Sequence, residues 1–462
     1  MLNLSYSKED LQSIIDLGLE TGGDFVELFF EDTIENSIEL TGDKVTSASR
    51  KNIHGVAVRI LKGDKTVNGY TNDFAKVKDL VKDLAESYTD SRIMSAKPLK
   101  EVEKDNITEF KVNPIDVDLD KKVGYLLKAH DAASKVSEEI VQIMATCIDK
   151  YQDIVVCNSD GVYASDVRTN IRAFITCVAS DGVDQQIGSF DVGGNTGYEL
   201  FENTDFAKLG IDAANQAITI LHADYVKGGK MDVVINNGFG GVILHEACVH
   251  SLEATSVAKG ASVFCNKLGQ KIASDIVTAV DDGTLHNYWG STNIDDEGKK
   301  TQRNVLIENG VLKSYLVDYR NSRIMNHPTT ASGRRQSYKY LPTSRMTNTF
   351  IVNGDSTIDE IISNTKYGLF AKDMGGGSVM PATGEFNFAV REGWLIEDGK
   401  LTKPVKGATL VGSGSEVLLK IDMIANNLST GHGMCGSVSG SIPTDVGQPT
   451  IRVKDITVGG KN

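Results

Sequence analysis

Two histidines and a glutamate in one short stretch offer the side chains of a catalytic zinc site. An apolar run beginning at Gly238 leads into His245-Glu246-Ala-Cys-Val-His250. Neutral imidazoles bind Zn²⁺, and a catalytic site keeps one coordination position open for a water molecule. A carboxylate beside that water can accept its proton, so the order His-Glu…His is typical of metal-dependent hydrolases. The stretch therefore indicates either the Zn²⁺ site of a hydrolase or two ordinary histidines on a partly buried helix.

The spacing of the histidines differs from the familiar HExxH motif, in which they lie four residues apart on one helix face. Here they lie five apart, so a regular α-helix would rotate His250 by about 140° from His245. Either the helix ends or widens into a π-bulge before His250, or these are two ordinary histidines on a partly buried helix. A shared metal requires a break from regular helical geometry between Glu246 and His250.

A third protein ligand must come from another part of the chain. The carboxylates close to the motif in sequence are Glu253, Asp281, Asp282 and Glu297. Far downstream, Cys435 stands in the glycine-rich segment Gly431–Gly436, where the backbone can bend sharply. A zinc-bound thiol is deprotonated, so this cysteine suits the role chemically. His432 is a second candidate for the same position, and a small residue in a tight loop is the alternative interpretation of Cys435.

Other features have structural alternatives beside their functional interpretation. Arg345 is a candidate for substrate contact, or else a member of a structural ion pair. Gly375 and Gly376 can expose backbone to a substrate or a phosphate, but no Lys-Ser/Thr follows them, which favours a simple turn. Asp281-Asp282-Gly283 can bind a cation or form a turn. The sequence contains no Gly-x-Ser-x-Gly elbow, which disfavours a serine hydrolase.

Hydrophobic periodicity and turn residues predict the elements that position these side chains. The predicted helices are a capped helix from Ser7 to Gly22-Gly23, 74–88, 118–136 and 205–225, together with the helix carrying the His-Glu motif. The predicted strands of the first half are 25–30, 37–40, 44–49, 55–61, 140–148, 153–157 and 166–180, followed by 231–235 in the second half. The predicted turns are Asn158-Ser-Asp-Gly161, Glu308-Asn-Gly310 and Glu397-Asp-Gly399.

Lys227-Gly-Gly-Lys230 marks a change of character along the 462-residue chain. We expect an N-terminal α+β domain over residues 1–226 and a C-terminal β-rich metallopeptidase domain over 227–462. The chain has 45 glycines and 8 prolines, a balance that suits strands, bulges and tight turns better than a helix bundle. The fold class is α+β: a mixed N-terminal α/β domain with antiparallel strands and a mostly β C-terminal domain carrying the metal-site helix.

Charge and cysteine usage limit the partners. The formal net charge is 48 − 62 = −14, which repels phosphate backbones and disfavours direct nucleic-acid binding. The six cysteines form no CxxC pair, as expected of free thiols in a reducing cytosol. No stretch resembles a signal peptide or approaches the roughly 18–20 apolar residues of a membrane span. We therefore expect a cytoplasmic protein without membrane partners.

Taken together, the motifs resemble those of the TldD/PmbA family of metalloproteases along most of the chain. Besides the HExxxH stretch with Glu253, the shared motifs are Asp281-Asp-Gly283, Ile294-Asp-Asp-Glu-Gly298, Gly333-Arg-Arg335, Pro342-Thr-Ser-Arg-Met-Thr-Asn-Thr349, Gly375-Gly-Gly377, Thr383-Gly-Glu-Phe386, Gly407-Ala-Thr-Leu-Val-Gly412, Cys435-Gly436, Val446-Gly-Gln-Pro449 and Thr457-Val-Gly-Gly460. Val249 and Ser251 stand where the family usually has glycines.

The resemblance implies a zinc peptidase acting on small or unfolded peptides held in extended form. Its metal ligands would be His245, His250 and Cys435, and its general base Glu246. Because the chain retains HExxxH, it resembles the active TldD-like subunit rather than the PmbA/TldE-like partner that lacks the motif. The resemblance further implies a homodimer, or a heterodimer with a PmbA/TldE-like chain.

Two other functions are compatible with the same residues. One is a non-catalytic, partner-binding subunit whose zinc site is structural, which a closed four-ligand site including His432 would favour. The other is a metal-dependent amidase with a non-peptide substrate. An open coordination position near Glu246 would favour catalysis over the structural role.

Overall fold

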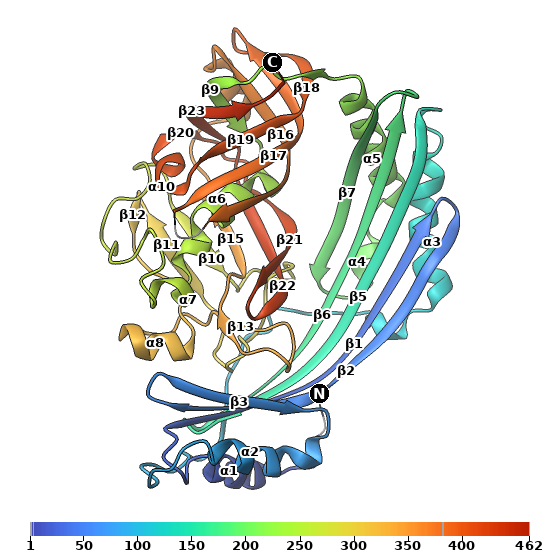
Figure 1. The fold of residues 1–462 in the computed structure, drawn as a ribbon. Coiled ribbons are helices and arrows are strands. Elements are labelled where there is room, and N and C mark those ends of the chain that lie inside the picture. Colours follow the sequence, from blue (N-terminus) through green and yellow to red (C-terminus); the bar gives the residue numbers. More distant parts are fainter. Residues whose placement is uncertain (1, 3, 381–382, 462) are drawn as a thin grey trace.

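The computed structural model describes residues 2, 4–380 and 383–461. A long, curved antiparallel sheet from the N-terminal half stands beside a β-rich C-terminal part (Figure 1). Strands outnumber helices in both halves, and the α+β class predicted from the sequence is confirmed. No helix within the described ranges combines the length and apolar character needed to cross a bilayer.

The long sheet has seven strands in the order β3-β2-β1-β5-β6, with β4 and β7 both paired to β6. Its strands are β1 (Phe25–Thr41), β2 (Lys44–Lys62), β3 (Lys65–Thr71), β4 (Lys100–Glu101), β5 (Ile140–Asn158), β6 (Val162–Ser180) and β7 (Gln185–Asn195). The prediction of four short strands between residues 25 and 61 is wrong, because β1 and β2 pair continuously over that length. The predicted turn at Asn158 is confirmed, and its side-chain oxygen accepts hydrogen bonds from the amides of Asp160 and Val162.

Helices cover the two ends of this sheet and leave its middle free of helices (Figure 1). At one end lie α1 (Lys8–Leu17) and α2 (Val77–Ala85), and at the other lie α3 (Leu119–Ala133) and α5 (Phe206–Leu221). The predicted capping box at Ser7 is confirmed, although α1 ends before Gly22. Each end has its own apolar core, one with α1 and α2 and the other with α3 and α5.

The middle of the sheet packs against the C-terminal part through buried ion pairs and a small apolar cluster. Arg168 on β6 forms an ion pair with Asp296 at 2.6 Å. Arg59 on β2 bridges Glu27 and Glu297 at 2.6 and 2.9 Å. All five side chains are buried. The polar residues inside these long strands therefore do not mark turns of the chain, because they contribute to the contact between the two parts together with an apolar cluster.

In the C-terminal part, five strands close into a ring because β16 pairs with both β9 and β17. The ring and its attached strands are β8 (Asp224–Tyr225), β9 (Gly229–Ile235), β16 (Tyr367–Met380), β17 (Glu385–Glu397), β18 (Lys400–Lys406), β19 (Ala408–Ser413), β20 (Ile421–Ile424) and β23 (Ile451–Gly459). The predicted strand 231–235 lies within β9, and the predicted turn at Asp398 and Gly399 joins β17 to β18 with positive φ at both residues.

A second C-terminal sheet has the order β12-β11-β10-β15-β22-β21. Its strands are β10 (Ala279–Asp282), β11 (Arg303–Glu308), β12 (Val311–Leu312), β15 (Asn348–Ile351), β21 (Ser429–Ser437) and β22 (Gly440–Gln448). A separate pair is formed by β13 (Gly333–Arg334) and β14 (Thr343–Ser344).

The remaining helices are α4 (Glu199–Glu202), α6 (Val242–Ala247), α7 (Ala254–Val257), α8 (Tyr319–Met325), α9 (Ile358–Ser363) and α10 (Gly414–Val417), with short 3₁₀ turns η1 to η5. Helix α6 contacts strands of both the ring and the second sheet.

Candidate metal centre

The His-Glu motif lies on α6, which ends before the second histidine. The α-helix runs from Val242 to Ala247, and a 3₁₀ turn, η4, begins at Val249. Between them, Cys248 has φ −126° and ψ −59°, outside the helical region. The break predicted between Glu246 and His250 is thereby confirmed as a helix end. No positive φ is used there, so Val249 fits without the glycine that the family usually has.

Close backbone contact brings the β21–β22 hairpin to this helix. The turn before α6, η3 (Gly238–Gly241), packs against both strands of the hairpin. A Cβ atom added to Gly241 would lie 2.4 Å from the backbone of Gly447 on β22, far closer than van der Waals contact permits. Only glycine at position 241 allows this approach, which sets the hairpin beside the motif.

The hairpin places Cys435 next to the two histidines. The ligand atoms of His245, His250 and Cys435 all lie within 4.8 Å of one another. Cys435 Sγ is 3.4 Å from His250 Nε2, and the two imidazole rings are nearly perpendicular, with centroids 4.8 Å apart. Of the described residues, these three alone form a group of this kind.

The charges of this group suit a cation. Burial alone would raise the pKa of the Cys435 thiol, but His245 and His250 lower it to about 3. Burial alone would lower the pKa of His250, whereas Glu253 and Cys435 raise it well above its usual value. His245 Nδ1 is a buried atom without a hydrogen-bond partner among the described residues, which a bound cation would satisfy. Two imidazoles and a thiolate are a ligand set that zinc accepts.

Glu246 borders the group on its more exposed side. Its Oε2 lies 3.7 Å from His250 Nε2, and its side chain is 26% exposed, against 14% for that of His250. His250 Nε2 thus faces both Cys435 and the Glu246 carboxylate. A carboxylate in this place can accept a proton from a molecule bound at the group.

Glu253 contacts the opposite edge of the His250 ring. Its Oε2 lies 3.2 Å from Nδ1, and the carboxylate is nearly buried. Sequence proximity made Glu253 a candidate third ligand, but it is not part of the three-residue group. A carboxylate on the far nitrogen of a metal-binding histidine fixes the ring orientation and its tautomer.

Arg345, expected to contact substrate, is fully buried. Its guanidinium donates hydrogen bonds to the carbonyl oxygens of Cys435 and Gly440 and to the Ser439 hydroxyl. Its Nε also lies 3.9 Å from Glu253. This position fits the structural alternative and does not support substrate contact, because the guanidinium instead holds the end of the hairpin that carries Cys435. Sequence offers no signal for this role beyond the Pro342–Thr349 motif.

His432 faces away from the metal group. Side chains alternate along a strand, so His432 and Cys435 point to opposite faces of β21. His432 Nδ1 is engaged with Asp445 Oδ1 at 2.8 Å. Within the described part of the chain no fourth His, Cys, Asp or Glu joins the group, so the closed four-ligand arrangement with His432 is not formed.

The other candidate residues lie in strands of the C-terminal part. Gly375 and Gly376 lie in an irregular stretch of β16, where its register with β17 shifts between Met374 and Gly377. They form neither a phosphate cradle at a helix start nor the predicted turn. Asp281 lies in β10 and accepts hydrogen bonds from Thr347 and Thr349, so it is satisfied within the protein.

Replacing Glu253 with glutamine is expected to weaken zinc binding about 10- to 100-fold, because the His250 ring loses its negatively charged partner. Competition with a chelator of known zinc affinity measures the effect, and Glu416→Gln, at an exposed site, is the control. The metal-free variant should melt near the wild type. Unchanged zinc affinity would show that Glu253 has no orienting role.

Sequence comparison places this site in a known group of proteins. Models of three domains of one family match residues 26–87, 112–221 and 228–460, described as PmbA/TldA metallopeptidase domain 1, central domain and C-terminal domain. The chain belongs to the TldD/PmbA family. A "Metalloprotease TldD homolog" of Haemophilus influenzae is 36% identical over 473 residues, covering 99% of this chain and 97% of that protein.

Further relatives agree with this placement. A "Zinc metalloprotease TldD homolog" of Saccharolobus solfataricus is 25% identical, covering 96% of this chain and 98% of the relative. The solved structure of TldE from Thermococcus kodakarensis has the same fold, with a TM-score of 0.76 at 17% identity over 97% of this chain and 100% of that one. The resemblance read from the motifs is confirmed, and the chain is a member of a metallopeptidase family.

Proposed function

We propose that this TldD/PmbA protein is a zinc-dependent peptidase that hydrolyses small or unfolded peptides bound in extended form. The observation that carries the proposal is the convergence of His245, His250 and Cys435 beside the partly exposed Glu246. The zinc metalloprotease name of the Saccharolobus relative supports the choice of metal. The three residues would hold Zn²⁺, which polarises a carbonyl and lowers the pKa of bound water toward about 7.

The chain's own residues supply the remaining steps. Glu246 would accept the proton of the attacking water at its carboxylate and pass it to the leaving amine. Glu253 would hold the His250 ring through Nδ1. The absence of a fourth ligand in the described group leaves room for substrate, which favours catalysis over a structural zinc site.

An extended peptide has a suitable strand close to this group. β21 is the edge strand of the second sheet and carries Cys435. A peptide can add to such an edge through main-chain hydrogen bonds, which gives loose sequence preference. The dimer implied by the family resemblance, with itself or with a TldE-like chain, stays a prediction that the mass in solution checks.

Removal and restoration of the metal test the proposal. Dialysis against a chelator is expected to abolish cleavage of unstructured peptides, and one equivalent of Zn²⁺ should restore it, because the proposed mechanism depends on the ion to polarise the carbonyl. Circular dichroism of the chelated protein distinguishes loss of activity from loss of fold. Full cleavage by folded, metal-free protein would overturn the proposal, and so would a zinc-loaded protein that cleaves no peptide.

A further inference from the structure

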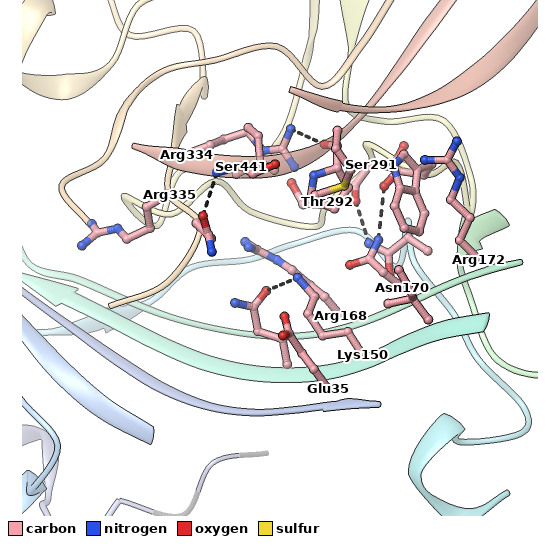
Figure 2. A pocket seen from close by; sticks show the side chains of 18 of the residues that line it. Glu35, Lys150, Arg168, Asn170, Arg172, Ser291, Thr292, Arg334, Arg335 and Ser441 are labelled. Carbon is pink, nitrogen blue, oxygen red and sulfur yellow. Dashed lines mark hydrogen bonds between the residues drawn. The ribbon is translucent and has the colours of Figure 1, made fainter. Parts of the chain in front are cut away.

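A cavity of about 210 Å³ lies between the long sheet and the β21–β22 hairpin (Figure 2). Lys150 and Asn170 line it from strands of the sheet, and Arg334 lines it from the opposite side. Met434 and Pro443, which pair across the hairpin, also belong to the lining. The cavity thus occupies the polar contact between the two parts of the molecule.

This cavity is separate from the metal centre. Met434 and Cys435 are neighbours on β21, so their side chains point to opposite faces of the hairpin. Trp289, another lining residue, donates a hydrogen bond from Nε1 to the carbonyl of Gly433 at 2.8 Å. Strand β21 is therefore a wall between the metal group and the cavity.

Cationic side chains gather around the cavity in a protein whose net charge is −14. The basic residues of the lining are Lys150, Arg168, Arg172, Arg334 and Arg335, and the acidic ones are Glu35 and Asp296. Three of the arginines already have carboxylate partners, since Arg168 pairs with Asp296, Arg172 with Asp191 and Arg335 with Glu27. Lys150 and Arg334 form no ion pair with any described residue.

Arg334, which forms no ion pair with a described residue, is buried. Arg334 is 5% exposed, and its Nη1 donates to the carbonyl oxygens of Met346 and Pro443. Burial lowers its pKa to about 10. The backbone carbonyls fix the geometry of this guanidinium, and Asp281 and Asp296 act on its charge without forming an ion pair with it. An anion that reaches it therefore gains a charge-assisted hydrogen bond.

The unpaired lysine faces the same space from the sheet. The hydrogen bond of Lys150 Nζ is a long one, 3.4 Å to Gln152 Oε1. Burial lowers the pKa of Lys150, and Glu35, directly opposite on β1, counters part of that effect. Figure 2 shows Lys150 and Glu35 side by side below the cavity and Arg334 above it.

The lining selects the kind of anion. Glu35 and Asp296 would repel a doubly charged phosphate more strongly than a single carboxylate. Trp289, Phe174 and Met434 add apolar and aromatic surface beside the cations. The volume equals that of about seven water molecules at about 30 Å³ each, so the ligand must be small. A carboxylate joined to a short apolar or aromatic body meets all three conditions.

We propose that this cavity binds a small carboxylate with an apolar body, its charge set between Lys150 and Arg334. Two sources offer this chemistry, a free aromatic acid and the C-terminal residue of a peptide. The site requires neither the metal nor peptide hydrolysis, so it stands independently of the peptidase activity.

Trp289 provides the signal for a binding experiment. The chain has two tryptophans, so Trp394→Phe leaves Trp289 as the sole indole. We expect phenylacetate to change its fluorescence saturably in metal-free protein. The neutral analogue phenylacetamide should bind at least about 10-fold more weakly, because it cannot form the ionic hydrogen bonds.

Substitutions made in the Trp394→Phe protein identify the cationic side chains that bind the carboxylate. Lys150→Met and Arg334→Gln are each expected to weaken phenylacetate binding about 10-fold, while Lys339→Gln, at an exposed site nearby, should not. Melting curves identify a variant that fails to fold. If Arg334→Gln does not fold, the result for Lys150→Met alone decides the test. Equal binding of acid and amide, or undiminished binding by folded Lys150→Met, would overturn the proposal.

Peptides separate the two sources. In metal-free protein, Ala-Ala-Phe with a free C-terminus is compared with its C-terminal amide and with phenylacetate. Tighter binding of the free-acid peptide than of phenylacetate assigns the cavity to peptide C-termini, and weaker binding assigns it to free acids. Absence of saturation by either acid would show that the cavity is not a carboxylate site. Because no cleavage is measured, failure here leaves the peptidase proposal untouched.

Discussion

Glu246→Gln is expected to reduce peptide hydrolysis by about 10²- to 10⁴-fold, the usual contribution of a positioned general base. Glutamine has nearly the same shape but cannot accept a proton at its amide. Because the Glu246 carboxylate lies 3.7 Å from His250 Nε2 and outside the three-residue ligand group, the variant should still bind zinc. The measurement pairs metal content with the rate of cleavage of an unstructured peptide.

A glutamate away from the group provides the comparison. Glu308→Gln removes an exposed carboxylate at the β11–β12 turn and should leave both rate and metal content unchanged. Wild-type cleavage by fully metallated Glu246→Gln would exclude this glutamate as the base. Loss of metal from the variant would instead mean that Glu246 helps to hold the ion.

Local sequence patterns predicted an element well where residues within that element determine its structure. The capping box at Ser7 and the β11–β12 turn at Asn309 and Gly310 depend on side chains and positive φ within a few residues, and both are present. The helix break at Cys248 was predicted on the condition that the two histidines share a metal, because a regular α-helix would point them in different directions.

Long strands were misjudged because their partners lie far away in sequence. Glu31 and Thr33 lie between the predicted strands 25–30 and 37–40, yet both belong to β1 and are buried. Glu31 accepts hydrogen bonds from Gln152 and from the amide of Tyr338, a residue of the C-terminal part. Strand β7 was not predicted, since its glycines and glutamines mask a strand that is ordered by pairing with β6.

The candidate site likewise contains residues whose role the sequence indicated and residues whose role depends on distant contacts. Residue chemistry nominated His245 and His250 and offered Cys435 as one of several third ligands, and the family resemblance implied the full set. The structure brings the three residues together, with Cys435 185 residues from His250 in sequence. The sequence left the roles of Arg345 and Glu253 open, because burial decides what a charged side chain does. Arg345 is buried against Cys435, Ser439 and Gly440, which lie 90 to 95 residues away in sequence, and a local pattern does not encode such contacts.

Cys435→Ala is expected to lower zinc affinity by about 10³-fold, since each ligand of a structural or catalytic site contributes roughly 4 kcal/mol of the binding free energy. Activity at limiting zinc should fall in parallel. Competition with a chromogenic chelator measures the affinity. Cys265→Ala is the matched control, because that thiol lies outside the group and donates a hydrogen bond to the carbonyl of Val257, at 3.6 Å.

The thiol's ionisation gives a second, independent readout of the same assignment. With its pKa lowered to about 3, Cys435 is a thiolate at pH 6 in the metal-free protein, whereas burial raises the pKa of Cys147, Cys177 and Cys248 to about 12. Ultraviolet absorbance at pH 6 should therefore show a thiolate that Cys435→Ala removes. If the variant lost this signal but bound zinc as tightly as wild type, the third ligand would be another residue.

If Glu246→Gln keeps its zinc and Cys435→Ala does not, metal binding and proton transfer belong to separate side chains, as the positions of these two residues require.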